Sequence, residues 1–336
     1  MNKLERILTI GAKNSVLAKL RSWGIPPANV AVLVVLILAP LVIRDQYILH
    51  LMVVSLLFGA QTIVFDFTTG FINIVNFGFA AFVGLGGYTS ALLVTGLGLS
   101  PWLGMLGGVI TAGMLGFLTG VLTLRLRGIY AAVMTWFLGL ALMALTAVEV
   151  DLTRGHWGLN VPLLASAGSK PTYYYVLLAM MVVIYFVLRV VIHSNIGLAF
   201  RAIGQDIEAA QSSGVNPTKY RVLNFTLACA FAGLLGGFYA HFVGVLTPDV
   251  MSTDKTVEVL ALSYIGGRGT LWGGILASFI FIPLFEYLKS LMELRLVIYG
   301  LLLIAVMLAF PDGLVGLLRR TVALIRKTRQ ERKVSQ

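Results

Sequence analysis

Long and nearly uncharged apolar runs, separated by short polar segments, are the feature that most constrains the fold of this chain. A membrane-crossing helix takes about 20 mainly apolar residues, whereas a strand of an outer-membrane barrel takes about ten that alternate in polarity. The runs are continuous, and 58% of the 336 residues are hydrophobic while only 12% are charged. We therefore expect an all-α, polytopic membrane protein rather than a soluble globule, a disordered chain or a barrel. Cys229 is the only cysteine, which excludes a disulfide scaffold.

Charges and Gly or Pro residues divide the apolar sequence into nine candidate spans. Basic residues gather at both ends of the chain, so both ends are expected in the cytoplasm, which requires an even number of crossings. We place a tenth crossing at 252–267, where the apolar stretch is so brief that the span should be short or broken. The other nine are expected at 26–43, 47–65, 71–97, 101–124, 129–149, 173–192, 222–245, 271–290 and 296–311.

The distribution of charge predicts three parts. These are a basic cytoplasmic N-terminal segment at 1–25, one transmembrane domain at 26–316 and a basic cytoplasmic tail at 317–336. With ten crossings, 19 of the 25 Lys and Arg residues lie on the cytoplasmic side. The net charge of +11 is concentrated beside apolar segments, so membrane lipid rather than nucleic acid is the expected partner of these charges.

Two predicted loops are longer than simple connectors. The external loop at about 150–172 is rich in Gly, Pro and Ser, and either receives a partner from outside or is a plain solvated loop. The cytoplasmic loop at about 193–221 mixes helix-forming residues with charges and has Gly214 followed by Asn216-Pro217. This pattern predicts one short helix outside the bilayer that stops at the glycine.

The sequence carries no pattern typical of catalysis, of a cofactor site or of a metal site. No phosphate-binding G-x-x-x-x-G-K-[ST] run occurs, and the four His residues lie far apart. The run GGRGTLWGG at 266–274 does not follow a soluble strand, so we expect a tight turn between helices rather than a nucleotide site. The turn residues are Gly266, Gly267, Arg268 and Gly269. We expect this chain not to be an enzyme.

Charged residues at membrane depth are scarce, with Glu258 and Glu286 as the main cases. A carrier driven by protons or sodium normally places more ionisable groups there. A secondary transporter therefore remains a minor alternative, together with a membrane-embedded enzyme and a scaffold without transport activity.

Residues 70–90 form the most unusual apolar stretch, because five Gly residues punctuate it and two Asn residues lie in its first half. A helix broken by glycine exposes backbone groups that need polar surroundings, as in the lining of a pathway. Close packing of helices through glycine explains the same pattern equally well, and both readings stay open. The candidate lining residues are Asn73, Asn76, Tyr88 and Thr89.

Five motifs spread over residues 45–318 carry a family resemblance. They are NIVNFGFAAFVGLGGYTSALL at 73–93, RLRGIYAAVMTW at 125–136, RAIGQDIEAAQSSGV at 201–215, GGRGTLWG at 266–273 and IYGLLLIAVMLAFPDGLVG at 298–316. In these motifs the chain resembles the integral membrane permease subunits of ATP-binding-cassette importers for branched-chain amino acids, in particular the M-type member of the H and M pair.

The resemblance implies a type II importer-like fold in the bacterial inner membrane. It also implies four partners: a homologous permease, two cytoplasmic ATPase subunits and a periplasmic or lipid-anchored substrate-binding protein. No cofactor is expected in this chain, because ATP and Mg would bind to the ATPase partners. Urea and short amides are the alternative cargo in related importers.

The resemblance assigns one further role, to the cytoplasmic loop. In such importers an E-A-A-x-x-x-G helix, called the coupling helix, docks into a groove on the ATPase. Small residues allow close approach to a partner, and charges on the rim add directional contacts. In this sequence the implied contact residues are Arg201, Asp206, Glu208, Ala209, Ala210 and Gly214.

Overall fold

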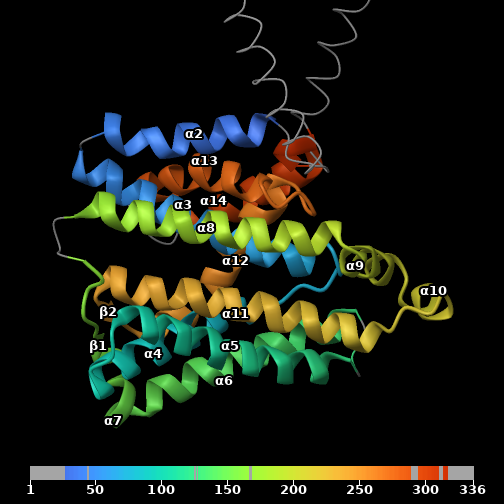
Figure 1. The fold of residues 1–336 in the computed structure, drawn as a ribbon, viewed down its shortest axis with the longest axis horizontal. Helices are drawn as coiled ribbons and strands as arrows, with labels where there is room; N and C mark the ends of the chain where they lie inside the picture. Colours follow the sequence, from blue (N-terminus) through green and yellow to red (C-terminus); the bar gives the residue numbers. More distant parts are fainter. Residues whose placement is uncertain are drawn as a thin grey trace, which may run out of the picture. The chain divides into compact units, whose positions relative to one another are not determined.

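The computed structural model describes residues 27–43, 45–124, 126, 128–165, 169–288, 294–309 and 313–316. Within them the protein is almost entirely helical, which confirms the expected all-α, polytopic fold (Figure 1). The basic segments expected at 1–25 and 317–336 lie outside the described residues. The ten longer helices that match expected spans are α2 (Pro27–Val42), α3 (Gln46–Thr69), α4 (Phe79–Leu97), α5 (Pro101–Thr123), α6 (Ile129–Val148), α8 (Lys170–His193), α11 (Pro217–Val243), α12 (Thr253–Gly266), α13 (Gly273–Tyr287) and α14 (Leu294–Ala309).

Smaller elements join these helices. The connections on the two sides of the bundle contain α7 (Val150–Thr153), η1 (Gly155–Trp157), α9 (Asn195–Gln205), α10 (Ile207–Ser212) and η2 (Pro248–Met251). Two strands of two residues each, β1 (Leu159–Asn160) and β2 (Val245–Leu246), pair antiparallel with Leu159 opposite Leu246. The structure divides into two compact units, Met1–His50 and Leu51–Gln336, and all side-chain contacts described below lie within the second unit.

Six helices in the described part of the chain are long and apolar enough to cross a membrane: α3, α4, α5, α6, α8 and α11. The remaining spans are shorter. At about 1.5 Å per residue, the 14 residues of α12 extend over roughly 21 Å, which is less than the hydrocarbon thickness of about 30 Å. The expectation of a short helix within 252–267 is therefore confirmed.

Two expected boundaries are wrong. The span expected at 71–97 becomes helical only at Phe79, because the backbone of Asn73 has a left-handed φ of 61° and residues 73–76 have no regular structure. The span expected from 222 begins at Pro217, since proline fits the first position of a helix and the Asn216 side chain caps it by accepting from the Lys219 N–H at 3.2 Å.

Glycine holds the centre of the second unit together, where α4, α5 and α11 pack. Gly86, Gly108 and Gly233 come from these three helices in turn, and a Cβ on any of them would collide with the backbone of another. Helix α4 continues without a break through this region. The glycines within α4 therefore provide close packing, and the break lies only in the segment 70–78.

The loop expected to hold one short helix holds two, α9 and α10. The chain breaks between them because Asp206 has an extended backbone with φ of −152° and caps the second helix with its own carboxylate. Helices α8 and α11 run in opposite directions, so α9 and α10 lie at one end of the bundle and the β1–β2 pair lies at the other (Figure 1).

We predict that Gly233→Val destabilises the bundle. Overpacking a dense core costs about 1–3 kcal/mol, and more where the obstacle is backbone that cannot rotate away. The melting temperature of the protein purified in detergent should fall. Gly96→Val in α4 is the matched control, because a Cβ there meets no atom within 4 Å. Equal melting temperatures for the two variants would contradict the packing role.

Candidate functional site

Helix α10 is a small exposed projection with both ends closed by hydrogen bonds. At its start, Asp206 Oδ1 accepts from the Glu208 N–H at 2.8 Å and the Ala209 N–H at 3.1 Å. At its end, the Val215 N–H donates to the Ala210 carbonyl at 3.0 Å, while Gly214 has a φ of +84°. This is a Schellman ending, which favours glycine at that position. The glycine of the E-A-A-x-x-x-G pattern is thus explained locally, because it ends α10.

The side chains of α10 divide into an inner and an outer set. Ala210 is buried where α10 packs beside α9 and α11, whereas Glu208 and Ala209 are exposed. A small outward residue beside a charge leaves a flat surface that a partner can approach closely. Of the residues expected at an ATPase contact, Ala210 alone is buried within this chain; the others are Arg201, Asp206, Glu208, Ala209 and Gly214, all exposed.

Helix α9 connects this projection to the membrane domain. The Arg201 guanidinium carbon lies 5.8 Å from the centroid of the Phe71 ring. A Cβ on Gly204 would lie 2.5 Å from the Phe71 carbonyl oxygen, so the helix backbone rests directly on the chain there. Phe71 belongs to the segment 70–78 that precedes α4. A displacement of α9 would therefore move the segment 70–78 through these contacts.

The segment 70–78 leads to a helix start that is capped by its neighbours. The Phe77 N–H donates to Thr135 Oγ1 in α6 at 3.2 Å, and the Ala80 N–H donates to Thr256 Oγ1 in α12 at 3.1 Å. The Asn76 side chain is buried and accepts from the Gly78 N–H at 3.1 Å. Backbone groups that leave a helix inside a membrane need such partners, because lipid offers none.

The Gly-rich run at 266–274 contains the turn between α12 and α13, which spans residues 267–272, while Gly266 ends α12 and Gly273 begins α13. Asp66 of α3 is buried beneath it and accepts from the Gly269 N–H at 2.8 Å and the Leu271 N–H at 3.0 Å. Leu271 has a φ of 57°, an unfavourable value for a leucine that these bonds help to hold. A Cβ on Gly70 would collide with the Asp66 carboxylate and with the turn, so only glycine fits beside them.

Arg268 ties the turn to the segment 70–78. Its Nη2 donates to the Asn73 Oδ1 at 2.6 Å and to the Thr69 carbonyl at 3.2 Å. The Asn73 side chain is exposed, and asparagine tolerates the left-handed backbone that presents it. Residues nearly 200 apart in sequence thus form one polar cluster, made of Asp66, Asn73, Arg268 and the turn backbone.

Tyr88 and Thr89 lie elsewhere, in the body of α4. Tyr88 is buried in an apolar cluster with Leu159, Leu246 and Met251, and its hydroxyl has no hydrogen-bond partner in the described part of the protein. Thr89 Oγ1 donates to the Leu85 carbonyl and accepts from Thr111 of α5 at 3.0 Å. The structure therefore separates these two residues from Asn73 and Asn76.

Sequence reasoning missed the polar residues that hold the broken segments. The expected span at 47–65 stopped one residue before Asp66, although that carboxylate stands in the apolar run TIVFDFTTGF. A charge inside such a run is itself a signal of buried function. Thr135 and Thr256 carried no signal, because threonine is common in membrane helices with its hydroxyl bonded to its own backbone.

Residues 150–165 form a ledge at the end of the bundle opposite α10. The His241 ring in α11 anchors it, with Nδ1 2.7 Å from the Pro162 carbonyl and Nε2 2.9 Å from Ser90 Oγ. The Tyr173 hydroxyl of α8 donates to the Ala165 carbonyl at 2.9 Å and accepts from the Ala165 N–H at 3.1 Å. These bonds, with the β1–β2 pair, give the ledge a defined shape.

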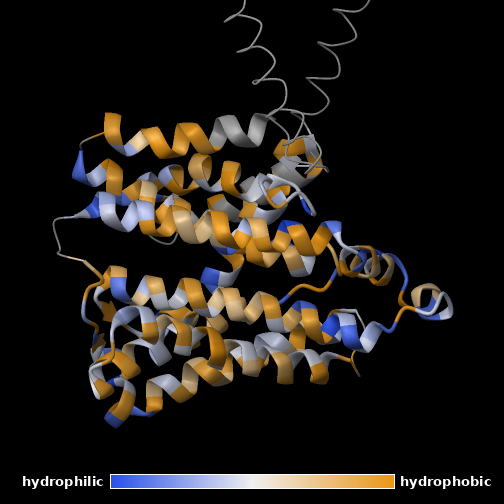
Figure 2. Cartoon of the chain, viewed as in Figure 1, coloured by the Kyte–Doolittle hydropathy of each residue, from blue (hydrophilic) through white to orange (hydrophobic). Residues whose placement is uncertain are grey.

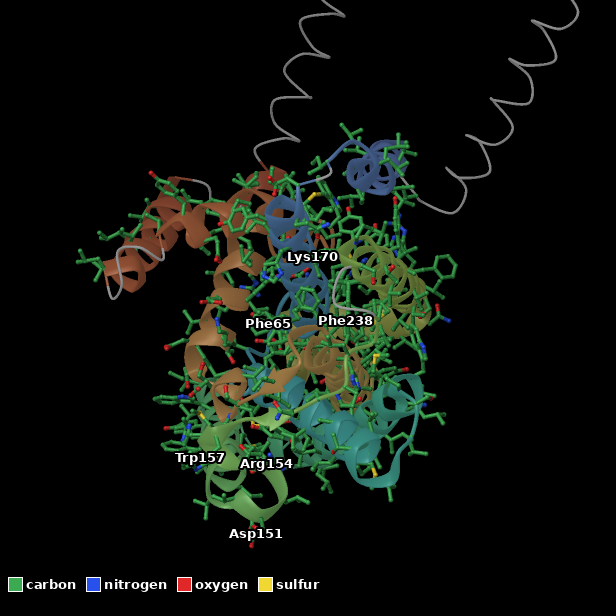
Figure 3. The ribbon with its side chains drawn as sticks, turned by 90° about the vertical axis from the view of Figure 1, so that its left-hand side faces the viewer. Phe65, Asp151, Arg154, Trp157, Lys170 and Phe238 are labelled. Carbon is green, nitrogen blue, oxygen red and sulfur yellow. The ribbon has the colours of Figure 1, made fainter. Side chains whose placement is uncertain are left out.

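The tip of the ledge presents an exposed aromatic residue. Trp157 is 89% exposed in η1, next to Arg154. Figure 3 looks at this end and shows Asp151, Arg154 and Trp157 at its rim, with the Asp151 side chain pointing away from the helices. Thr153 Oγ1 holds the turn below them by accepting from the Gly155 N–H at 3.2 Å. A large aromatic side chain held on a rigid turn is typical of a binding surface.

We predict that Asp66→Ala destabilises the turn between α12 and α13. The change leaves the N–H groups of Gly269 and Leu271 without their acceptor, and each buried orphan costs about 1–3 kcal/mol. The melting temperature in detergent should fall, and less so for Asp66→Asn, which keeps one acceptor oxygen. Asp151→Ala, at an exposed position, is the control. An Asp66→Ala protein that melts like this control would refute the role of the carboxylate.

Comparison with known proteins connects this architecture to a family. The family model described as branched-chain amino acid transport system / permease component matches residues 47–307. The high-affinity branched-chain amino acid transport system permease protein LivM of Salmonella typhimurium is 29% identical over 139 residues, which are 41% of this chain. LivH of the same organism is 25% identical over 270 residues, covering 74% of this chain and 87% of LivH.

A further relative belongs to a different import system. The autoinducer 2 import system permease protein LsrC of Yersinia pseudotuberculosis is 27% identical over 138 residues, covering 38% of this chain and 39% of LsrC. The matched part of the chain covers only 33% of the length of the curated LivM relatives. No solved structure matches it. The family model, however, extends over most of the chain, from the first turn of α3 into α14, and the chain therefore belongs to the family of permease components of branched-chain amino acid transport systems.

Proposed function

We propose that this chain is the transmembrane permease subunit of an ATP-binding-cassette importer for branched-chain amino acids, located in the bacterial inner membrane. Family membership and the names of LivM and LivH support the substrate class. One structural observation carries the coupling role: an exposed, doubly capped α10 is connected through α9 to the polar segment 70–78. ATP hydrolysis would occur on separate ATPase subunits, so this chain would hold neither ATP nor Mg.

The orientation that fits this function puts α9 and α10 in the cytoplasm and the ledge outside. Both termini then lie in the cytoplasm, with the basic segments 1–25 and 317–336 beside the inner leaflet and the transmembrane domain 26–316 between them. The ATPases would bind at α10. A binding protein loaded with substrate would dock at the ledge, and a homologous permease would complete the pathway.

The pathway would run beside the broken segment 70–78 on the cytoplasmic half of the bundle. Exposed Asn73 and buried Asn76, which precedes α4, provide uncharged polar side chains in this segment, and the Arg268 guanidinium is bonded to Asn73. Tyr88 and Thr89 would lie on the outer half, beside the ledge. Rocking of α9 against Phe71 gives a physical route from ATP-driven closure to this segment.

A second class of transported compound is an alternative, because of one observation. The LsrC relative belongs to an import system for a different compound, so the family does not restrict its members to branched-chain amino acids. Related importers for urea or short amides are the alternative. Comparing the uptake of labelled leucine and labelled urea by the reconstituted complex decides between the two classes.

We predict that Ala209→Glu separates the permease from its ATPases. The residue is exposed, so the fold should tolerate the change, but a glutamate would be buried without a partner at a close interface and cost about 3–5 kcal/mol. The variant should reach the membrane yet fail to co-purify with ATPase subunits, and its uptake should be lost. Asn160→Glu on the ledge adds the same charge at the opposite end and should keep the ATPases. Full ATPase binding by Ala209→Glu would refute the coupling role of α10.

We predict that Trp157→Ala weakens docking of the binding protein. Truncating a central aromatic at an interface typically costs about 2 kcal/mol or more, which is roughly a 30-fold loss of affinity. The concentration of binding protein that gives half-maximal uptake should rise, while the maximal rate stays unchanged. Trp102→Ala is the matched control, because Trp102 is also exposed but stands at the start of α5. A similar small effect of both variants would show that Trp157 serves the lipid interface.

A further inference from the structure

The start of α12 places charged residues well inside the bundle. Lys255 Nζ lies 6.0 Å from the centroid of the Phe58 ring, near the middle of α3. Thr253 Oγ1 accepts from Trp136 Nε1 at 2.9 Å, seven residues into α6. In Figure 2 the hydrophilic start of α12 lies along the length of the helices, away from the hydrophilic residues at their two ends. These charges are therefore at membrane depth.

The charges form a pair of opposite sign. Lys255 Nζ lies 3.1 Å from Glu258 Oε2 and 3.3 Å from Glu258 Oε1. Asp254 is on the same face of the helix, one turn before Glu258, and the positive end of the helix dipole favours a carboxylate there. The group thus combines one ammonium with two carboxylates.

The side chains of this charged group are partly exposed on the surface of the chain. The Lys255 side chain is 46% exposed and the Glu258 side chain 12% exposed, while the opposite face of α12 is buried through Thr256, Val259 and Leu262. Exposed charges at membrane depth face a water-filled cavity or another protein, because hydrocarbon contact costs several kcal/mol. The open face of α12 is therefore turned either to a water-filled space or to a partner subunit, and the pathway of a permease pair lies between its subunits.

We propose that Lys255, Glu258 and Asp254 form the site that binds the head group of a zwitterionic amino acid in transit. The α-carboxylate pairs with the Lys255 ammonium, and the α-ammonium pairs with Glu258 and Asp254. A free amino acid carries both charges on one carbon, so a site that offers an ammonium group beside carboxylates matches both of its charges. Urea and short amides have neither an α-carboxylate nor an α-ammonium group, so this site would not bind them. This inference rests on the proposed transport function and selects amino acids within it.

A short helix suits this task. A helix that begins within the membrane offers both its charged first turn and its positive dipole end to a ligand, whereas a full-length span would place both at the surface. The Thr256 hydroxyl on the buried face also caps α4, so α12 is held in position while its charged face stays open.

The test uses the whole complex, with both permeases, the ATPases and the binding protein, reconstituted in liposomes. Lys255→Gln and Glu258→Gln should each lower the maximal uptake of labelled leucine at least tenfold, even with saturating leucine-loaded binding protein. The ATPases should still co-purify, and the loaded binding protein should still stimulate ATP hydrolysis. Lys170→Gln, the same substitution at the start of α8, should leave uptake unchanged.

A charge-swapped variant separates binding from a purely structural ion pair. Lys255→Glu combined with Glu258→Lys restores the pair but reverses its direction, so uptake should stay low if the pair binds the head group. Recovery of uptake in this double variant would overturn the proposal, as would normal leucine uptake by Lys255→Gln in a working complex. A working complex that carried labelled urea but not labelled leucine would overturn the proposed substrate class, and the head-group site with it.

Discussion

The structure depends on one constraint: a backbone that leaves helical geometry inside a membrane must find its hydrogen-bond partners within the protein. The chain does this at the segment 70–78 and at the turn between α12 and α13. Thr135 and Thr256 accept from the amides at the start of α4, and Asp66 accepts from two amides of the turn. Each partner comes from a different helix. The irregular segments are therefore not loose connections but the places where the helices are bound to one another.

Two kinds of contact hold the helices together: close packing at glycine residues and hydrogen bonds from polar side chains. Gly86, Gly108 and Gly233 bring three helices into backbone contact, which yields a compact and rigid half made of α4, α5 and α11. Polar contacts join α3, α6 and α12 to the broken segments, beside an apolar cluster shared by α3, α12 and α13. A rigid group of helices beside a hydrogen-bonded region is the arrangement that a rocking motion requires, since packed helices move as one body and hydrogen bonds can exchange.

The proposed roles follow the path of contacts through the molecule. The exposed α10 is linked to α9, α9 rests on Phe71, and the same segment is bound by Arg268 through Asn73. The turn that contains Arg268 ends α12, whose other end carries Lys255 and Glu258. A displacement at the proposed ATPase contact thus has a continuous physical route to the proposed head-group site. Double-mutant cycles between Arg201 and Arg268 would measure whether the two are energetically coupled.

The sequence alone determined the helical class, the position of nearly every span and the local form of α10, because apolar length, capping residues and the glycine stop act within a few residues of themselves. It also indicated the turn at 266–269. The sequence did not determine whether the glycines of 70–90 interrupt a helix or allow close helix packing, and it gave no role for Asp66. Only the tertiary structure decided these points, since the Asp66 carboxylate meets its amides more than 200 residues away and Gly86 meets Gly233 in another helix. Such long-range partners leave no periodicity or spacing in a single chain, whereas local hydrogen bonds do.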